Sequence, residues 1–348
     1  MDDFIRQPRE ERRVYFEQTA ARLRLSPQII EKDFWVCWTL KELFGLPDIG
    51  TTLIFKGGTS LSKVYRIIER FSEDIDVSLD RASLGFGGES DPEAGGSAKE
   101  QARRLDRLRQ ACQEKIVAHL KPAFEKTITA KFGQAAGWSV IVDEADPDRQ
   151  TLLYAYPSSW PDRTAGYVRA AVKIEMGARS DHWPSEQAEI SPYVAQQFPA
   201  AFKAPSFKVK VLAAERTFWE KATLLHAEHH RPVDKTMPLR LSRHYYDLLR
   251  LIQSGLGEKA AQDLELLRRV VEHKKVFFRS GWAHYETAQQ GSLRVSPTPD
   301  RLKPLEADYD KMQEMFFGDR PAFTEIFRVI REWEDEFNRT SKPKKAST

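Results

Sequence analysis

The chain has 348 residues, about two domains' worth, and 41% of them are hydrophobic, which is enough for a sizeable core. The formal net charge is only +3, so any nucleic-acid-binding surface must come from local clustering of basic residues. The two cysteines, Cys37 and Cys112, lie far apart, which excludes a structural zinc site built on CxxC pairs and indicates a reducing compartment.

No apolar run approaches the roughly 18 residues that a membrane-spanning helix needs. The N-terminal residues, 1–6, lack the basic region and the apolar stretch that are typical of a secretory signal. We therefore expect a cytoplasmic protein that does not bind a membrane.

Residues 8–46 carry apolar side chains at helical spacing, and Ser26-Pro27 is typical of the cap and first turn of a second helix in that stretch. The pattern then predicts a buried strand, a helix with one apolar stripe and a second strand. A mobile loop rich in Gly, Ser, Glu and Asp follows, and after it comes a long polar helix. In chain order these five segments are residues 51–56, 60–70, 73–80, 82–98 and about 98–120.

Two strand-like stretches, at about 137–144 and 151–156, flank Asp146-Pro-Asp148, which is typical of a hairpin turn. A third strand is expected over Tyr167–Gly177 and a shorter one over Phe207–Leu212. Helical periodicity dominates the remainder of the chain, first near 213–229 and then over 239–338.

This order of elements predicts an α+β fold, in which a mixed-sheet core is preceded by helices and followed by a helical domain. Residues 339–348 are polar and basic, which is typical of a disordered tail. We expect N-terminal helices that pack on the core, the core itself, a helical C-terminal domain and the tail, over residues 1–50, 51–212, 213–338 and 339–348.

The turn Gly57-Gly58-Thr59-Ser60 lies between the first strand and the following helix. Backbone N–H groups and a hydroxyl at such a turn can cradle the phosphates of a nucleotide. The alternative is an ordinary strand-to-helix turn with a Thr or Ser cap. The turn is not a P-loop, because no GxxxxGK[ST] motif is present.

Asp74 and Asp76 flank Ile75 in the second strand, so their carboxylates project from one face of the sheet. Acids are poor strand residues, and a conflict between local preference and position is expected of a functional site. Such a pair can bind the divalent cations that promote displacement at phosphorus. The alternative is that both acids simply lie on the solvated face of a half-exposed strand.

Two cations need more ligands than two aspartates supply, and Glu175 is the best candidate for a third carboxylate. It lies late on an apolar strand and shares a face with Lys173. Asp143 and Glu144 are weaker alternatives, and Glu175 could instead be a solvated acid at a sheet edge.

A basic and aromatic stretch in the C-terminal region suits RNA, because cations follow a phosphate backbone and aromatic rings stack on bases. The alternative is an amphipathic helix with a buried aromatic side. The basic members are Arg268, Arg269, His273, Lys274, Lys275 and Arg279, and the aromatic members are Phe277, Phe278 and Trp282. For His226, His229 and His230 we favour a solvated helix end over a metal site, because no HExxH motif is present.

The residues Gly57–Leu61 and Arg70–Asp76 resemble the DNA polymerase β-like nucleotidyltransferase superfamily and, more closely, the AbiEii/AbiGii toxin family, which includes the MenT toxins. The resemblance extends over roughly residues 28–335. Glu220-Lys221 is similar to the third motif of the family and Arg243-His-Tyr-Tyr-Asp247 to the fourth. Two further stretches look like members of this group, Glu31-Lys-Asp-Phe-Trp and His273–Arg279. The Gly/Ser/Glu segment after Asp80 departs from the common core.

The resemblance implies an enzyme that uses Mg²⁺ or Mn²⁺ to move a nucleoside monophosphate from an NTP to RNA, with the 3′ end of tRNA as the favoured acceptor. It implies a toxin of a toxin–antitoxin or phage-defence system, whose partner is an antitoxin protein. Lys221 would contact the phosphates or assist at the acceptor, and Asp247 would orient Lys221 or the nucleotide. The nucleotide would be bound by Gly57, Gly58, Thr59, Ser60, Arg70, Ser72 and Lys221.

Two other functions stay open at this point. The acceptor could be a protein side chain or a small molecule, which a largely uncharged acceptor cleft would favour. The chain could also be an inactive nucleotide- or RNA-binding module, although the presence of Asp74, Asp76, Lys221 and Asp247 argues against that function.

Overall fold

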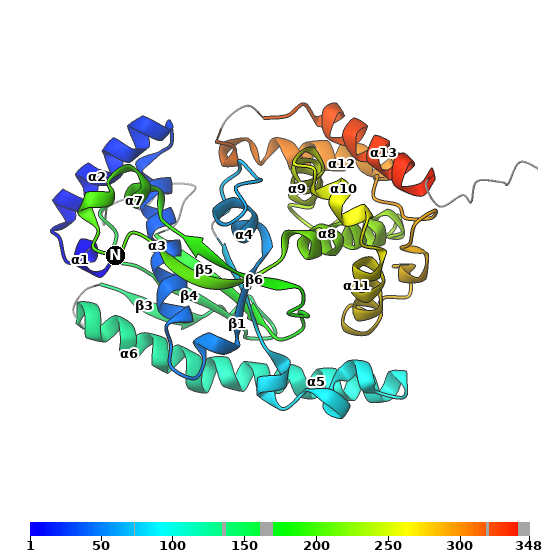
Figure 1. Ribbon diagram of the computed structural model, residues 1–348, viewed down its shortest axis with the longest axis horizontal. Helices are drawn as coiled ribbons and strands as arrows, with labels where there is room; N and C mark the ends of the chain where they lie inside the picture. Colours follow the sequence, from blue (N-terminus) through cyan, green and yellow to red (C-terminus); the bar gives the residue numbers. More distant parts are fainter. Residues whose placement is uncertain (73, 134–136, 161–169, 318–319, 340–348) are drawn as a thin grey trace, which may run out of the picture. The chain divides into compact units, whose positions relative to one another are not determined.

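The computed structural model describes residues 1–72, 74–133, 137–160, 170–317 and 320–339 (Figure 1). The chain forms two compact units, and the first contains Met1–Tyr65 and Phe71–Leu212. The second contains Arg66–Arg70 and the chain from Ala213 onward. The four-part division of the chain stays a prediction, and residues 340–348 of its tail lie outside the described residues.

The first unit is built on a seven-stranded mixed sheet with the order β3-β4-β5-β2-β1-β7-β6. The pairs β5–β2 and β1–β7 are parallel, and the other neighbouring pairs are antiparallel. The strands are β1 Leu53–Lys56, β2 Asp74–Leu79, β3 Ser139–Val142, β4 Thr151–Ala155, β5 Ala171–Gly177, β6 Ser185–Ile190 and β7 Phe207–Leu212. This mixed sheet confirms the predicted α+β class.

Helix α3 packs on strands β2, β5 and β7, and its buried aromatic side chains fill the core of the first unit. Trp35 and Trp38 contact Tyr154 of β4 through their rings. As expected, Ser26 caps α3 by accepting a hydrogen bond from the Ile29 N–H group. The helices of this unit are α1 Asp2–Ile5, α2 Arg9–Leu23, α3 Pro27–Phe44, α4 Gly57–Lys63, α5 Ala98–Glu114, α6 Lys121–Phe132 and α7 Tyr193–Gln197.

The second unit is helical, as predicted for residues 239–338. Helices α9 and α13 pack together, and α8 contacts α9, α10 and α11. Its core contains a cluster of aromatic rings in which Trp219 of α8 contacts Trp333 and Phe337 of α13. The helices are α8 Ala214–His229, α9 Ser242–Gln253, α10 Leu256–Ala261, α11 Leu264–Phe277, α12 Pro299–Asp310 and α13 Phe323–Arg339. No helix in the described ranges is long and apolar enough to cross a membrane.

The helix predicted over 60–70 is wrong at both ends. Helix α4 starts at Gly57 and ends at Lys63, and Arg66 has a left-handed backbone with φ of 53°. Residues 66–70 instead pack within the second unit, where the Glu69 N–H group donates to the Tyr246 hydroxyl. Contacts between residues far apart in the chain therefore override the local helical pattern.

Three further expectations change. The segment predicted as a mobile loop contains three 3₁₀ helices, Arg81–Leu84, Gly88–Ser90 and Pro92–Ala94. An ion pair connects the first of these short helices to the residue between the other two, because Nε of Arg81 lies 2.6 Å from Oδ2 of Asp91. The polar helix does not end near residue 120, because α5 continues through a π-helical turn into α6. Strand β6 was not predicted from the sequence. Residues 167–169 of the predicted third strand lie outside the described residues.

Candidate active site

Gly57 lies directly against the carboxylate of Asp76. Lys56 of β1 pairs with Asp76 of β2, so the chain turns into α4 beside that side chain. A Cβ atom on Gly57 would lie 2.0 Å from Oδ2 of Asp76, and Gly57 has φ of 78°, a conformation that favours glycine. The glycine that opens the turn is therefore needed for the close approach of backbone and carboxylate.

We expect Gly57→Ala to lower the activity of this site about 100-fold or more, because the added methyl group must displace the Asp76 carboxylate. Gly85→Ala is the matched control, since Gly85 also has positive φ but a Cβ atom there meets nothing within 4 Å. Steady-state rates of both variants, with circular dichroism to check folding, test this. Equal rates for the two variants would contradict the proposed role of the close approach.

The hydroxyl groups of the turn bind the protein itself. Thr59 donates to the backbone carbonyl of Asp74, and its Oγ1 lies 2.9 Å from Oγ of Ser72. Ser60 donates to the carbonyl of Gly57 at 2.8 Å, and both Thr59 and Ser60 are buried. The Thr59 bond fixes α4 to the start of β2 and the Ser60 bond lies within α4, so both hydroxyls support the turn in this structure. Direct phosphate contacts by these hydroxyls stay a prediction.

Asp74 and Asp76 lie on one face of β2, whereas Ile75 and Val77 on the other face are buried. Glu175 of β5 pairs in register with Asp76, so its side chain emerges beside that carboxylate. The sequence-predicted carboxylates thus come from two adjacent strands. No sequence-local pattern could have shown that β2 and β5 are neighbours.

Lys173 is a basic group in this acidic region. Its Nζ donates to Oε1 of Glu175 at 2.6 Å. Partial burial acts to lower the pKa of Lys173, but the bond and charge of Glu175 outweigh it, with Asp74 and Asp143 adding to the effect. The pKa of Lys173 is therefore held above its ordinary value, and Lys173 stays charged and occupies the third carboxylate.

The residues present fit a divalent cation only in part. Asp74 and Asp76 supply carboxylate oxygens, the donors that Mg²⁺ and Mn²⁺ prefer. Within the part of the chain that the structure describes, no group of three or more His, Cys, Asp or Glu side chains is arranged to hold a metal ion. Asp74 and Asp76 are therefore the candidate ligands, whereas Oε1 of Glu175 is bound to Lys173.

A second cluster lies within the helical unit. Asp247 of α9 is fully buried and accepts two hydrogen bonds from Arg70, at 2.7 and 2.8 Å. Its Oδ2 also accepts from Nζ of Lys221 of α8 at 2.8 Å. Asp247 thus binds Lys221 directly, and its expected role of orienting Lys221 or the nucleotide stays a prediction. The structure adds that the same carboxylate binds Arg70, which the sequence reading assigned only to the nucleotide.

The carboxylate of Asp247 binds two cations, Arg70 and Lys221. Burial acts to raise the pKa of Asp247, but Arg70 and Lys221 outweigh it and hold that pKa well below its usual range. The pKa of Lys221 is lowered, first by burial and then by the positive charges of Arg70 and Arg243, and Asp247 offsets this only partly. An anionic group near Lys221 would relieve this repulsion.

A family model described as "Nucleotidyl transferase AbiEii toxin, Type IV TA system" matches residues 38–335. The chain belongs to the AbiEii nucleotidyltransferase toxin family. It is therefore a nucleotidyltransferase, and the predicted family and enzyme class are confirmed. The family is part of a toxin–antitoxin system, which implies an antitoxin partner.

One solved structure shares this fold. The AbiEii-family chain is similar to MenT4, a nucleotidyltransferase toxin from Mycobacterium tuberculosis H37Rv, with 16% identity, a TM-score of 0.50 and coverage of 94% of this chain and 90% of MenT4. It also matches JHP933 from Helicobacter pylori, with 13% identity, a TM-score of 0.38 and coverage of 91% and 96%. The MenT4 likeness shows the nucleotidyltransferase fold alone. No curated protein matches the chain.

The expected RNA-binding stretch of this AbiEii-family protein is only partly a surface. His273 and Lys274 of α11 are buried, and Lys274 donates to the backbone carbonyl of Glu220 at 2.8 Å. Arg268 pairs with Glu265, and Lys275 with Glu272 at 2.8 Å, each three residues apart on the helix. The prediction that His273 and Lys274 lie on a surface that contacts RNA is wrong, because both are buried. The exposed Arg268, Arg269 and Arg279 stay candidates for RNA contact.

The histidines at the end of α8 do not form a solvated helix end. His226 is fully buried, its Nδ1 accepts from the Arg294 N–H group, and its Nε2 lies 3.0 Å from the His284 carbonyl. The His230 ring centre lies 4.7 Å from that of His226, 5.0 Å from that of His229 and 4.9 Å from that of His284. Burial, and then the charges of these three neighbours, lower the pKa of His230 to about 4.

We expect this cluster to make the helical unit less stable in mild acid. His230 takes up a proton near its ordinary pKa of 6.5 when unfolded but only near 4 when folded, so its contribution is present above pH 6.5 and lost as the pH falls towards 4. His230→Gln should reduce this loss by on the order of 1 kcal/mol, allowing for solvent screening. Urea unfolding at pH 7 and pH 5 measures it, and His119→Gln, at an exposed position, is the control. An identical pH dependence of stability in the wild type and both variants would contradict the assigned role of His230.

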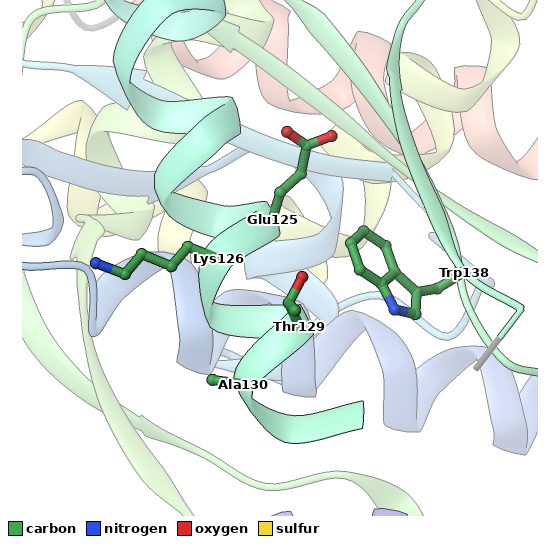
Figure 2. A pocket seen from close by; sticks show the side chains of 5 residues that line it. All are labelled: Glu125, Lys126, Thr129, Ala130 and Trp138. Atoms are coloured by element: carbon green, nitrogen blue, oxygen red, sulfur yellow. The ribbon is translucent and has the colours of Figure 1, made fainter. Parts of the chain in front are cut away.

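A pocket of about 640 Å³ lies elsewhere in the first unit, beside α6 (Figure 2). Figure 2 shows that the Lys126 side chain extends away from Trp138. The Trp138 indole donates to the backbone carbonyl of Gly133 at 2.9 Å, which fixes the ring. The lining residues are Glu125, Lys126, Thr129, Ala130 and Trp138. None of the predicted site residues lines this pocket, so we do not assign it to the reaction.

Proposed function

We propose that this nucleotidyltransferase moves a nucleoside monophosphate from an NTP to a terminal hydroxyl of RNA, with the tRNA 3′ end as the favoured acceptor. Mg²⁺ or Mn²⁺ would be the cofactor, and the reaction would take place in the cytoplasm. The observation that carries the proposal is the buried cluster of Arg70, Lys221 and Asp247, in which two cations share one carboxylate. Such a cluster suits a polyanionic substrate such as a triphosphate.

In the proposed mechanism the turn at Gly57 and Gly58 receives the phosphates, and Asp247, which Arg70 orients, holds the Lys221 ammonium in place. The acceptor hydroxyl attacks the α-phosphate, and the bond from the α-phosphate to pyrophosphate breaks. Lys221 binds a phosphate oxygen and offsets the negative charge that builds up in this step. When bound at Asp74 and Asp76, the divalent cation would supply Lewis-acid stabilisation of the phosphate oxygens. Pyrophosphate is the leaving group.

Arg268 and Lys275 pair with acids on their own helix, so part of their charge is already neutralised. This observation supports a second class of acceptor beside RNA. A protein side chain or a small molecule needs no long basic surface. We therefore keep nucleotide transfer to such an acceptor as the alternative. An antitoxin protein is the proposed partner, in a toxin–antitoxin or phage-defence system.

Incubation with each α-labelled NTP, Mg²⁺ and total cellular RNA, followed by separation of RNA from protein, tests the proposal. We expect label in RNA, concentrated in the tRNA fraction. Label in protein alone would favour the alternative, and the absence of transfer with every NTP and acceptor would contradict the proposal. The same incubation with Lys221→Met distinguishes transfer from contaminating activity, since that variant should transfer no label.

A further inference from the structure

Helix α4 is held at both ends. At its start Gly57 lies against the Asp76 carboxylate, and at its end Lys63 donates through Nζ to Oδ1 of Asp33 at 2.5 Å. Asp33 lies on α3, and its Oδ2 accepts from the Tyr193 N–H group at 2.7 Å. The side chains of Lys63 and Asp33 are only 5% and 4% exposed, so solvent cannot replace either partner.

The surroundings of Lys63 keep its ammonium charged and fixed. Burial acts to lower the pKa of Lys63, but the charge of Asp33 outweighs it and raises that pKa above its ordinary value. The Lys63 ammonium also lies 3.7 Å from the centre of the Tyr193 ring. A buried ion pair adds little to net stability, and the best-attested reason to keep one is to specify one arrangement.

The arrangement that this pair specifies is the position of the glycine turn. Helix α4 has seven residues and is about 10 Å long, so a shift at Lys63 moves Gly57 as well. In the middle of the helix, Thr59 is bound to the start of β2. Asp33 thus holds one end of a short rigid element whose other end determines where the Asp76 carboxylate lies.

We propose that Asp33 is a positioning residue of the nucleotidyltransferase, which acts through Lys63 and α4 to hold the Gly57 turn against Asp76. This inference rests on the proposed role of that turn and of Asp76 in nucleotide binding. It gives a role to the Glu31-Lys-Asp33 stretch, which precedes the residues matched by the family model. Glu31 serves another contact, because its carboxylate accepts hydrogen bonds from Ser158 and Ser159.

Asp33→Asn tests the inference against Glu42→Gln. Glu42 is a matched control, because it is also a buried acid on α3 that pairs with lysines, Lys41 at 2.8 Å and Lys131 at 3.1 Å, and neither lysine lies on α4. Both variants should lose stability. We expect Asp33→Asn to lower kcat/KM for the NTP about 10- to 100-fold and to weaken NTP binding, and Glu42→Gln to change either by less than about 2-fold.

A double variant, Asp33→Asn with Lys63→Met, separates position from stability. It leaves no unpaired buried charge, so its stability should return towards that of the wild type. Its NTP affinity and kcat/KM should stay low, because the bond that holds α4 is still missing. The inference would be overturned if the double variant recovered NTP affinity and kcat/KM. It would also be overturned if Asp33→Asn changed these two quantities as little as Glu42→Gln does.

Direct titration of Mg-NTP, by calorimetry, keeps this inference apart from the proposed function. A wild-type protein that binds the NTP but labels no RNA would contradict the proposed acceptor and leave the Asp33 comparison intact. A wild-type protein that transfers nucleotide, with an Asp33→Asn variant of unchanged affinity and rate, would overturn only the inference.

Discussion

Replacing Asp76 with asparagine should abolish nucleotide transfer, with a rate at least about 10³-fold below the wild type, while the fold is retained. Asparagine has the same shape but lacks the charge that a divalent cation and its bound phosphates require. Asp76 is only half-buried, and its strand is fixed by the buried residues Ile75 and Val77, so the substitution should cost little stability.

Label transfer from an NTP, measured over a range of Mg²⁺ concentrations, gives the rate, and thermal unfolding monitors the fold. Asp143→Asn is the matched control, because Asp143 is the weaker sequence candidate and its Oδ1 caps a turn at Ala145. We expect that variant to stay active. A folded Asp76→Asn protein with near-normal activity would refute the assignment of the site.

Asp247→Asn should destabilise the helical unit by about 3–5 kcal/mol and also eliminate activity. The substitution leaves the Arg70 and Lys221 cations buried with no carboxylate between them, which is the costly way to break a buried ion pair. Lys221→Met should cost less stability, since Arg70 keeps both of its bonds to Asp247. Urea unfolding of the two variants gives the comparison.

The pH dependence adds a second measurement for Asp247. Its pKa is lowered in the folded protein, so the stability it provides is fully present above the unfolded value of 3.8 and is lost as the pH falls through the folded value. The wild type should therefore lose stability below about pH 4 by a component that Asp247→Asn lacks. Equal stability of wild type and Asp247→Asn at pH 7 would show that the ion pairs of Asp247 with Arg70 and Lys221 do not stabilise the folded protein.

The first half of the site is readable in the sequence because its pattern is local. Two acids that flank Ile75 must share a face of any strand, and a glycine pair at a strand-to-helix turn permits close approach of the backbone. The α+β class follows in the same way from alternating and helical apolar spacing. These features depend on neighbours within a few residues, so one sequence is enough to show them.

Other features were decided only by the tertiary structure, because they join residues that are distant in the chain. Arg70 and Asp247 are 177 residues apart, and only the folded chain shows that they form an ion pair. The same holds for the ion pair of Asp33 with Lys63. The burial of Lys274 is also a result of the tertiary structure, because the helical period of the sequence does not show whether that position is buried or exposed. Local preference even failed at residues 66–70, where contacts with α9 replaced the predicted helix. Spacing along the chain fixes which side chains share a face, but burial and ion pairing depend on which faces meet, and that is a property of the whole fold.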